Sequence, residues 1–259
     1  MSKITIEGKQ LFFQRLGQGV PLIMIHGSLC RHRLWDLQQS LTKRAQLVLL
    51  DLPGHGDSEP LDGSISVSRF SRIIAKLMHR LKLRSVVPVG HSLGGAIAIQ
   101  LALDYPQLLS GLVLIGTGAK LGVLPAILEG LRTQYKAGIE LTIGQLGFAP
   151  HADPKLVEWS KAECLYCDPS IGYADFVACN EFDVRNRIHE IKVPTLVLFG
   201  EEDQLTPIKW AHFLADKIPK AKLTIIQQAG HMVMLEQPEN VNAAISSFLK
   251  DLSENTHQY

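Results

Sequence analysis

The sequence has almost no excess charge of either sign. Its 259 residues contain 26 Lys and Arg against 25 Asp and Glu, which leaves a net charge of +1. No long run of one sign is present, so the chain lacks a basic or acidic arm of the kind that binds nucleic acid or a membrane surface. Hydrophobic residues make up 46% and charged residues 20%, a balance typical of globular proteins. The length suits one large domain, or one domain with an insertion, that buries its own core.

A long uninterrupted apolar segment is also missing. Residues 1–19 contain no apolar core of the length that a signal peptide needs and no small-residue cleavage site. Residues 85–103 lack Asp, Glu, Lys and Arg, but Pro88 and three glycines interrupt them, which suits a buried strand, turn and helix better than a membrane span. We therefore expect a cytoplasmic protein with no membrane partner.

Cysteine is scarce, with four residues in the chain. Four are too few for a disulfide scaffold of this length, and without a sign of export we expect them to be reduced. Cys164 and Cys167 form a C-x-x-C, but no second pair or nearby histidine completes a tetrahedral metal site. We interpret the pair as two cysteines one turn apart on a helix, and we expect no metal.

Short apolar runs alternate with stretches of helical character. This alternation predicts an α/β protein with about eight strands in a mostly parallel sheet, covered by helices on both faces. The first two runs, ITIE and LFFQR, are joined at Gly8-Lys9 and predict an antiparallel hairpin. The remaining runs are LIMI at Leu22, LVLL at Leu47, VVPV at Val86, LVLI at Leu112, TLVLF at Thr195 and LTII at Leu223.

Five core helices are expected, two of them begun by a proline in the first turn. Their ranges are 34–43, 67–81, 93–103, 207–217 and 238–249. Between Gly118 and Lys192 strand-like runs disappear and amphipathic pieces replace them, so we predict a helical insertion at 119–192 between core parts 1–118 and 193–259. We expect about a third of its aromatic residues to line an apolar pocket. These residues are Tyr135, Phe148, Trp159, Tyr166, Tyr173, Phe176 and Phe182.

One short motif carries a specific chemical prediction. Gly90-His91-Ser92-Leu93-Gly94 reads G-x-S-x-G directly after a strand and directly before a helix. A serine at such a turn is held above the sheet edge in a strained conformation, and glycines on both sides leave room for the neighbouring backbone. We predict that Ser92 is a nucleophile.

A hydroxyl is a poor nucleophile at neutral pH, so Ser92 requires a base and a group that orients the base. Asp203 follows the strand TLVLFG, and His231 follows the strand LTII, so both are expected at the carboxyl edge of the sheet. The order Ser, Asp, His is the one that accompanies G-x-S-x-G. We predict His231 as general base and Asp203 as its orienting acid, with Glu201 and Glu202 as less favoured acids.

Acyl transfer also needs two hydrogen-bond donors for the developing oxyanion. We expect these to be the backbone N–H groups of Leu93 and of Ser28, which follows the strand LIMI, with Leu29 as the fallback for Ser28.

Two other histidines are not favoured for proton transfer. We expect His91 to point away from Ser92 and to make a local hydrogen bond, and His55 to belong to a glycine-rich turn.

Taken together, the motifs resemble those of the α/β-hydrolase superfamily of serine hydrolases. They are HGS at His26, DLPGHGDS at Asp51, GHSLGG at Gly90, GEEDQLTP at Gly200 and GHMVMLEQP at Gly230. The resemblance covers residues 20–118 and 193–249, and it implies that the insertion is a cap that encloses the substrate with the core and that no cofactor is used. The sequence is most similar to the small esterases, enol-lactonases and carbon–carbon bond hydrolases of the group. Ser92 stands where the family's dehalogenases and epoxide hydrolases carry an aspartate, which disfavours both activities. Pro88 departs from the pattern of a central strand, and we expect a bulge or a non-bonded position there.

The combined prediction is a serine hydrolase that cleaves a small or medium carboxylic ester through an acyl-enzyme. Carbon–carbon bond hydrolysis, lactone opening and aminopeptidase activity share the same triad and remain open. In the last case Glu163 or Glu181 is either an amine anchor or part of a solvated face. A receptor that binds a small ligand without turnover is the non-enzyme alternative. The expected partner is a small acyl substrate, and the oligomeric state stays open.

Overall fold

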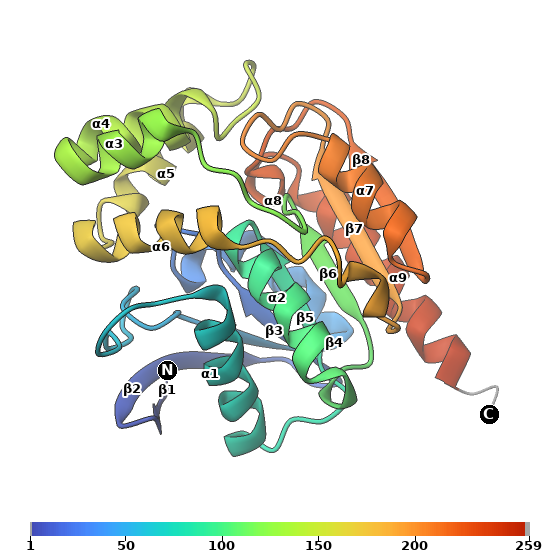
Figure 1. Ribbon diagram of the computed structural model, residues 1–259. Helices are drawn as coiled ribbons and strands as arrows, with labels where there is room; N and C mark the ends of the chain where they lie inside the picture. The colour runs from blue at the N-terminus through green and yellow to red at the C-terminus, as the bar shows by residue number, and fades with distance from the viewer. Residues whose placement is uncertain (1, 257–259) are drawn as a thin grey trace.

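The computed structural model describes residues 2–256 and has an eight-stranded sheet at its centre (Figure 1). The strand order is β1-β2-β4-β3-β5-β6-β7-β8, with β1 and β2 antiparallel, β2 and β4 antiparallel, and every other pair parallel. This confirms the predicted mostly parallel sheet and its N-terminal hairpin. The strands are β1 (Ser2–Ile6), β2 (Lys9–Leu16), β3 (Val20–Ile25), β4 (Ala45–Leu50), β5 (Val87–His91), β6 (Leu112–Ile115), β7 (Thr195–Gly200) and β8 (Ala221–Ile226).

Side chains on the central strands alternate between two hydrophobic clusters, one on each face of the sheet. In β3, Ile23 and Ile25 belong to one cluster while Leu22 and Met24 belong to the other, as the two-residue period of a strand requires. The first face is covered by α1 (Val67–Arg80), α2 (Leu93–Asp104) and α7 (Lys209–Lys217). The second is covered by the 3-10 helix His32–Lys43, α8 (Val233–Glu236) and α9 (Pro238–Thr256).

Two short 3-10 turns lie at Pro106–Leu108 and Ile188–Glu190. Five further helical segments lie between β6 and β7 in the chain and gather at one end of the sheet (Figure 1). They are α3 (Pro125–Thr133), α4 (Tyr135–Ile139), a π-helical turn (Glu140–Gln145), α5 (Pro154–Cys164) and α6 (Pro169–Glu181). We call residues 119–192 the cap, and these bounds stay a prediction.

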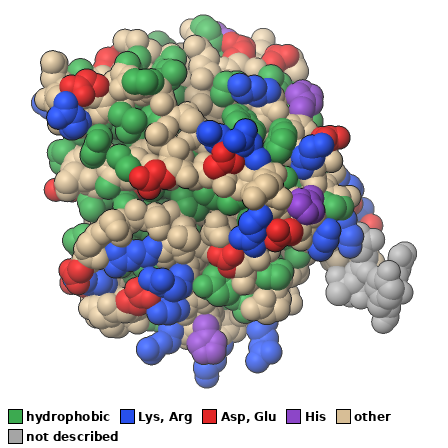
Figure 2. Space-filling view, viewed as in Figure 1, with side chains coloured by type: hydrophobic (Ala, Val, Ile, Leu, Met, Phe, Trp, Pro, Cys, Tyr) green, Lys and Arg blue, Asp and Glu red, His purple; other side chains and the backbone are tan. Residues whose placement is uncertain are grey.

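On the face that Figure 2 shows, acidic and basic side chains stand beside one another rather than in a single large patch of one sign.

Four local predictions differ from the structure. The helix expected at 238–249 continues to Thr256 as α9. The helix expected from Pro207 begins at Lys209, after a first turn closed by the hydrogen bond from the Trp210 N–H to the Pro207 carbonyl at 2.9 Å. The segment expected as an ordinary helix at 34–43 is a 3-10 helix. Cys167 is not on a helix with Cys164, since α5 ends at Cys164 and Cys167 lies in the turn that follows. All four cysteines are free thiols.

The proline in strand β5 occupies a partly unpaired position. Pro88 pairs in register with Ile23 of β3, but pairing with β6 is interrupted between Val86 and Val89. The predicted non-bonded position is therefore confirmed on the β6 side. Pairing with β6 resumes at Val89, so the end of β5 that leads to Ser92 is paired on both sides.

Candidate active site

Ser92 occupies the sharp turn between β5 and α2. Its φ and ψ are 54° and −117°, a left-handed conformation that costs free energy in any residue except glycine. A Cβ at Gly90 would collide with the carbonyl of Gly94, and a Cβ at Gly94 would collide with the carbonyl of Ile25 on β3. Glycine is therefore required on both sides of the turn. The Ser92 hydroxyl makes no cap hydrogen bond to α2.

His231 and Asp203 meet beside this turn, although 28 positions separate them in the sequence. The His231 Nδ1 lies 2.8 Å from Asp203 Oδ2, and both residues are buried. The other carboxylate oxygen of Asp203 accepts the backbone N–H groups of Leu205 at 2.9 Å and Thr206 at 2.8 Å. The carboxylate is thus fixed on one side by its own turn and directed at the imidazole on the other.

Thr206 is a site residue that the sequence analysis missed. Its hydroxyl donates to Asp203 Oδ2 at 2.6 Å and lies 3.2 Å from His231 Nδ1. The spacing D-x-x-T after a strand is typical of a turn in which the acid accepts bonds from the residues that follow it, and this spacing was available in the sequence.

Ser92 and His231 line one cavity together with Ser28. Among the residues that the structure describes, no hydrogen bond joins the Ser92 hydroxyl to the imidazole. Such bonds are often long before a substrate is bound. Leu93 is the first residue of α2, so its N–H has no partner within the helix.

In the loop after β3, the backbone N–H groups of Ser28 and Leu29 differ in whether they have a hydrogen-bond partner. The Leu29 N–H donates to Asp175 Oδ2 at 3.4 Å, and Leu29 has a φ of 65°. No hydrogen bond within the described residues uses the Ser28 N–H, and the Ser28 hydroxyl lies 3.7 Å from the Cys179 thiol. The donor of Leu29 is therefore occupied, while that of Ser28 remains available.

His91, next to the nucleophilic turn, makes a long-range hydrogen bond rather than the predicted local one. Its Nε2 lies 3.0 Å from the backbone carbonyl of His231, so Nε2 carries the proton and donates. Burial and the neighbouring His231 hold the pKa of His91 well below its usual value of 6.5, and the ring is neutral. His91 thus fixes the backbone of the segment that carries His231, a role that its position beside Ser92 did not indicate.

His55 is also more than a turn residue. Its Nε2 lies 2.8 Å from Asp175 Oδ2 of α6, and both side chains are fully buried. Burial opposes the charged imidazolium, but the charge of Asp175 and the hydrogen bond to it outweigh burial and hold the pKa of His55 well above 6.5. Because Asp175 also accepts from Leu29, this ion pair connects the cap to the loop that carries Ser28.

Replacing Asp175 by asparagine is expected to lower the free energy of unfolding by about 3 kcal/mol, because breaking a buried ion pair leaves its partner without a compensating charge. The raised pKa of His55 gives stability that is fully present below about pH 6.5 and is lost as the pH rises through the folded-state value. The difference between wild type and variant should therefore shrink in alkaline buffer. Urea denaturation at several pH values measures both effects.

Glu181→Gln is the matched control for Asp175→Asn. Glu181 lies on the same helix with an exposed side chain, so its replacement should change stability by less than about 0.5 kcal/mol. Equal losses of unfolding free energy in the two variants would show that α6 tolerates no change of charge. The His55–Asp175 pair would then contribute no more to stability than an exposed charge on the same helix.

The cavity has a volume of about 300 Å³ and is enclosed by both core and cap. Of the seven cap aromatics, Phe176 lines it, so the expectation that a third would do so was too high. Phe148 and Phe182 pack into the core instead.

Glu163 is paired with Arg31 and Arg33 of the core at 2.8 and 2.9 Å, and Glu181 is exposed and outside the cavity lining. Neither glutamate is placed to anchor an amine.

No group of three or more His, Cys, Asp or Glu within residues 2–256 has the arrangement of a metal site. Over the same range, no helix combines the length and the apolar character needed to cross a bilayer.

Comparison with known proteins agrees with this fold. A model of the alpha/beta hydrolase family matches residues 22–244. The chain is 29% identical to a pimeloyl-[acyl-carrier protein] methyl ester esterase of Nitrosomonas europaea, over 88% of this chain and 95% of that protein. It is also 29% identical to a 2-hydroxymuconate semialdehyde hydrolase of Pseudomonas putida, over 91% of this chain and 89% of that one. Among solved structures, a thermophilic esterase is 34% identical over 97% of each chain, with a TM-score of 0.86. The chain belongs to the alpha/beta hydrolase family.

Proposed function

We propose that the protein is a serine hydrolase that cleaves small to medium carboxylic esters through an acyl-enzyme. The observation that carries this proposal is the buried contact of 2.8 Å between His231 and Asp203 on the cavity that Ser92 also lines. A histidine oriented by a carboxylate and facing a strained serine is the arrangement that makes a hydroxyl nucleophilic.

In the first half of the reaction, Ser92 Oγ attacks the acyl carbonyl while His231 Nε2 takes the hydroxyl proton. Asp203 accepts a hydrogen bond from the Nδ1–H of the imidazole, which keeps Nε2 free to act as base and stabilises the imidazolium that forms. His231 then gives the proton to the departing alcohol, and the ester bond of the acyl-enzyme replaces that of the substrate. In the second half a water molecule repeats the attack, and Ser92 recovers its proton.

The backbone N–H groups of Leu93 and Ser28 are the proposed donors to the oxyanion. The unpaired N–H at the first residue of α2 supports Leu93, and the positive end of the helix dipole adds to its effect. The occupied N–H of Leu29 supports Ser28 over its neighbour. Removal of one oxyanion donor costs about 10²- to 10³-fold in rate in related chemistry.

The size and lining of the cavity support a small acyl substrate. A volume of about 300 Å³ lies at the lower end for ligand pockets, and most of the lining is apolar. The esterase relatives favour an oxygen ester, whereas the 2-hydroxymuconate semialdehyde hydrolase favours carbon–carbon bond cleavage with the same residues. We place the ester first because two of the three relatives carry that activity in their names.

A fluorophosphonate probe and a substrate panel test the proposal. The probe should label Ser92, located by mass spectrometry of the digested protein. The panel compares short-chain p-nitrophenyl esters with lactones and dienone acids, and we expect the highest kcat/KM among the esters. Labelling of Ser92 with turnover of a dienone acid alone would reassign the protein to carbon–carbon bond hydrolysis. Tight binding of small molecules without turnover of any substrate would identify a receptor instead.

A further inference from the structure

The charged residues that line the active-site cavity are of one sign. The lining includes the ammonium-bearing Lys120 and Lys209, and within the described residues it includes no Asp, Glu or Arg. A neutral ester needs no charge in its pocket. Two lysines with no acidic residue in the same lining therefore point to an anionic group on the ligand.

Lys120 has only a weak partner within the protein. Its Nζ lies 3.5 Å from Asp183 Oδ2, but Asp183 is held more closely by Arg185, at 2.6 and 2.8 Å. The hydrogen bonds from Arg185 are the main reason that the pKa of Asp183 falls to about 2. Because Arg185 holds this carboxylate more closely than Lys120 does, an anionic ligand can compete with Asp183 for the Lys120 ammonium.

Lys209 has no ion pair or hydrogen-bonding partner for its ammonium among residues 2–256. It is the first residue of α7, where the helix dipole places partial positive charge and a lysine is locally unfavourable. An anion bound at this position would relieve the repulsion. The position thus has a cost in the free protein that a ligand of negative charge would offset.

The two lysines lie on segments that contact each other at the rim of the cavity. A Cβ at Gly118 would lie 2.8 Å from the Lys120 carbonyl oxygen and 3.0 Å from the ring of Trp210, the neighbour of Lys209. Gly122 and Leu124 on one segment, and Gln204 and Pro207 on the other, are exposed and also line the cavity. This rim is therefore where the cavity meets solvent.

The cavity also has an apolar part. Ile127, Ile143 and Phe176 of the cap contribute apolar side chains to its lining. A ligand that satisfies both regions has an apolar chain in the cavity and an anionic group at the rim.

We propose that Lys120 and Lys209 bind a carboxylate at the rim of the cavity, and that the substrates are half-esters of short dicarboxylic acids. This inference rests on the proposed function and names its substrate class. The ester carbonyl lies at Ser92 and the free carboxylate lies between the two ammonium groups. Ion pairs at a solvent-exposed rim are individually modest, so together we expect about a tenfold preference in kcat/KM, which salt reduces.

Monomethyl and dimethyl esters of the same acids, from succinic to suberic, test the proposal. The two members of each pair share the chain and the scissile bond, and differ in the charge of the distal group. At low ionic strength wild type should cleave the best monomethyl ester with about tenfold higher kcat/KM than its dimethyl counterpart, and 0.5 M NaCl should reduce this ratio. In Lys120→Gln/Lys209→Gln the ratio should fall toward one, and in Lys120→Arg/Lys209→Arg it should persist.

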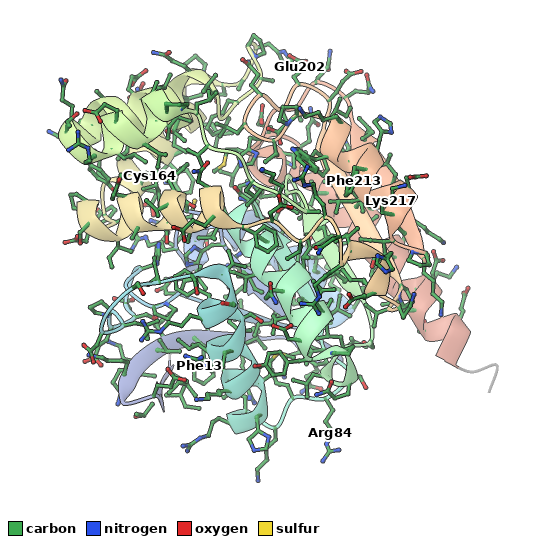
Figure 3. All side chains as sticks on the ribbon, in the orientation of Figure 1. Phe13, Arg84, Cys164, Glu202, Phe213 and Lys217 are labelled. Carbon is green, nitrogen blue, oxygen red and sulfur yellow. The ribbon has the colours of Figure 1, made fainter. Side chains whose placement is uncertain are left out.

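Lys217→Gln is the matched control, because Lys217 ends the same helix α7 and lies outside the cavity lining (Figure 3). Its ratio should equal that of wild type. A wild-type ratio of one or less, with the dimethyl esters cleaved, would overturn this inference and leave the proposed function intact. A high ratio that survives in the double glutamine variant would also overturn it. If no ester is cleaved and the fluorophosphonate does not label Ser92, the proposed function fails and this inference fails with it.

Discussion

Ser92→Ala should lower kcat for the best ester by about 10⁴- to 10⁶-fold while leaving the fold intact. The loss is large because the hydroxyl forms the covalent intermediate, and no neighbouring group can replace it. The backbone of Ser92 keeps its hydrogen bonds in the variant, since its N–H donates to Ile115 O at 3.0 Å and its carbonyl accepts from Gly95 and Ala96. The hydroxyl makes no cap bond, so α2 does not depend on it.

Initial rates with a saturating ester, together with thermal melting, measure this prediction. Ser71→Ala is a suitable control, because Ser71 is a buried serine on α1 whose hydroxyl has no hydrogen-bond partner and which lies outside the cavity lining. It should retain wild-type kcat. If Ser92→Ala kept more than about a tenth of the wild-type rate with an unchanged melting temperature, the acyl-enzyme mechanism would be wrong.

The centre of the sheet could be predicted from the sequence because β5, β6 and β7 are buried on both faces. Such strands appear as short continuous apolar runs, and each of the eight runs corresponds to a strand in the structure. Helix boundaries were predicted less accurately than the strands. The helix expected from Pro207 begins at Lys209, after a turn closed by the Trp210 N–H and the Pro207 carbonyl at 2.9 Å, and the helix expected to end at Leu249 continues to Thr256.

Part of the candidate site could likewise be predicted from the sequence, and part could not. Ser92, Asp203 and His231 were predicted as a set because each follows a strand, and the carboxyl ends of parallel strands meet at one edge. The contact between His55 and Asp175 joins positions 120 apart, one in the core and one in the cap. No periodicity encodes such a pair, because the packing of the cap on the core alone brings the two side chains together.

The same reason explains the aromatic residues of the cap. Composition indicated an apolar pocket, but it could not say which rings face the cavity, since that depends on how each cap helix is rotated. Phe176 faces it, whereas Trp159 lies under the guanidinium of Arg33, with 5.7 Å between the two groups. The lysines at the rim were overlooked for a related reason, because exposed lysines are common and only the lining of the cavity distinguishes these two.

Asp203→Asn should lower kcat by about 10⁴-fold with little loss of stability. The asparagine oxygen can still accept the N–H groups of Leu205 and Thr206, which leaves the amide nitrogen facing His231 Nδ1. Because that nitrogen donates, it favours the tautomer with the proton on Nε2, which cannot take the proton of Ser92. Initial rates and thermal melting of the variant measure the two effects.

Glu202→Gln provides the comparison that decides which acid orients His231. Glu202 is adjacent in sequence, but its carboxylate is directed at the exposed His151, 3.9 Å away, at the outer edge of the molecule (Figure 3). A base needs an acid within hydrogen-bond reach of its Nδ1, and Asp203 at 2.8 Å meets this condition. We therefore expect Glu202→Gln to retain kcat within about twofold, since surface charges away from the reacting atoms contribute little. A loss in Glu202→Gln as large as that in Asp203→Asn would contradict the assignment, because the two carboxylates could then not be distinguished by their distance from the imidazole.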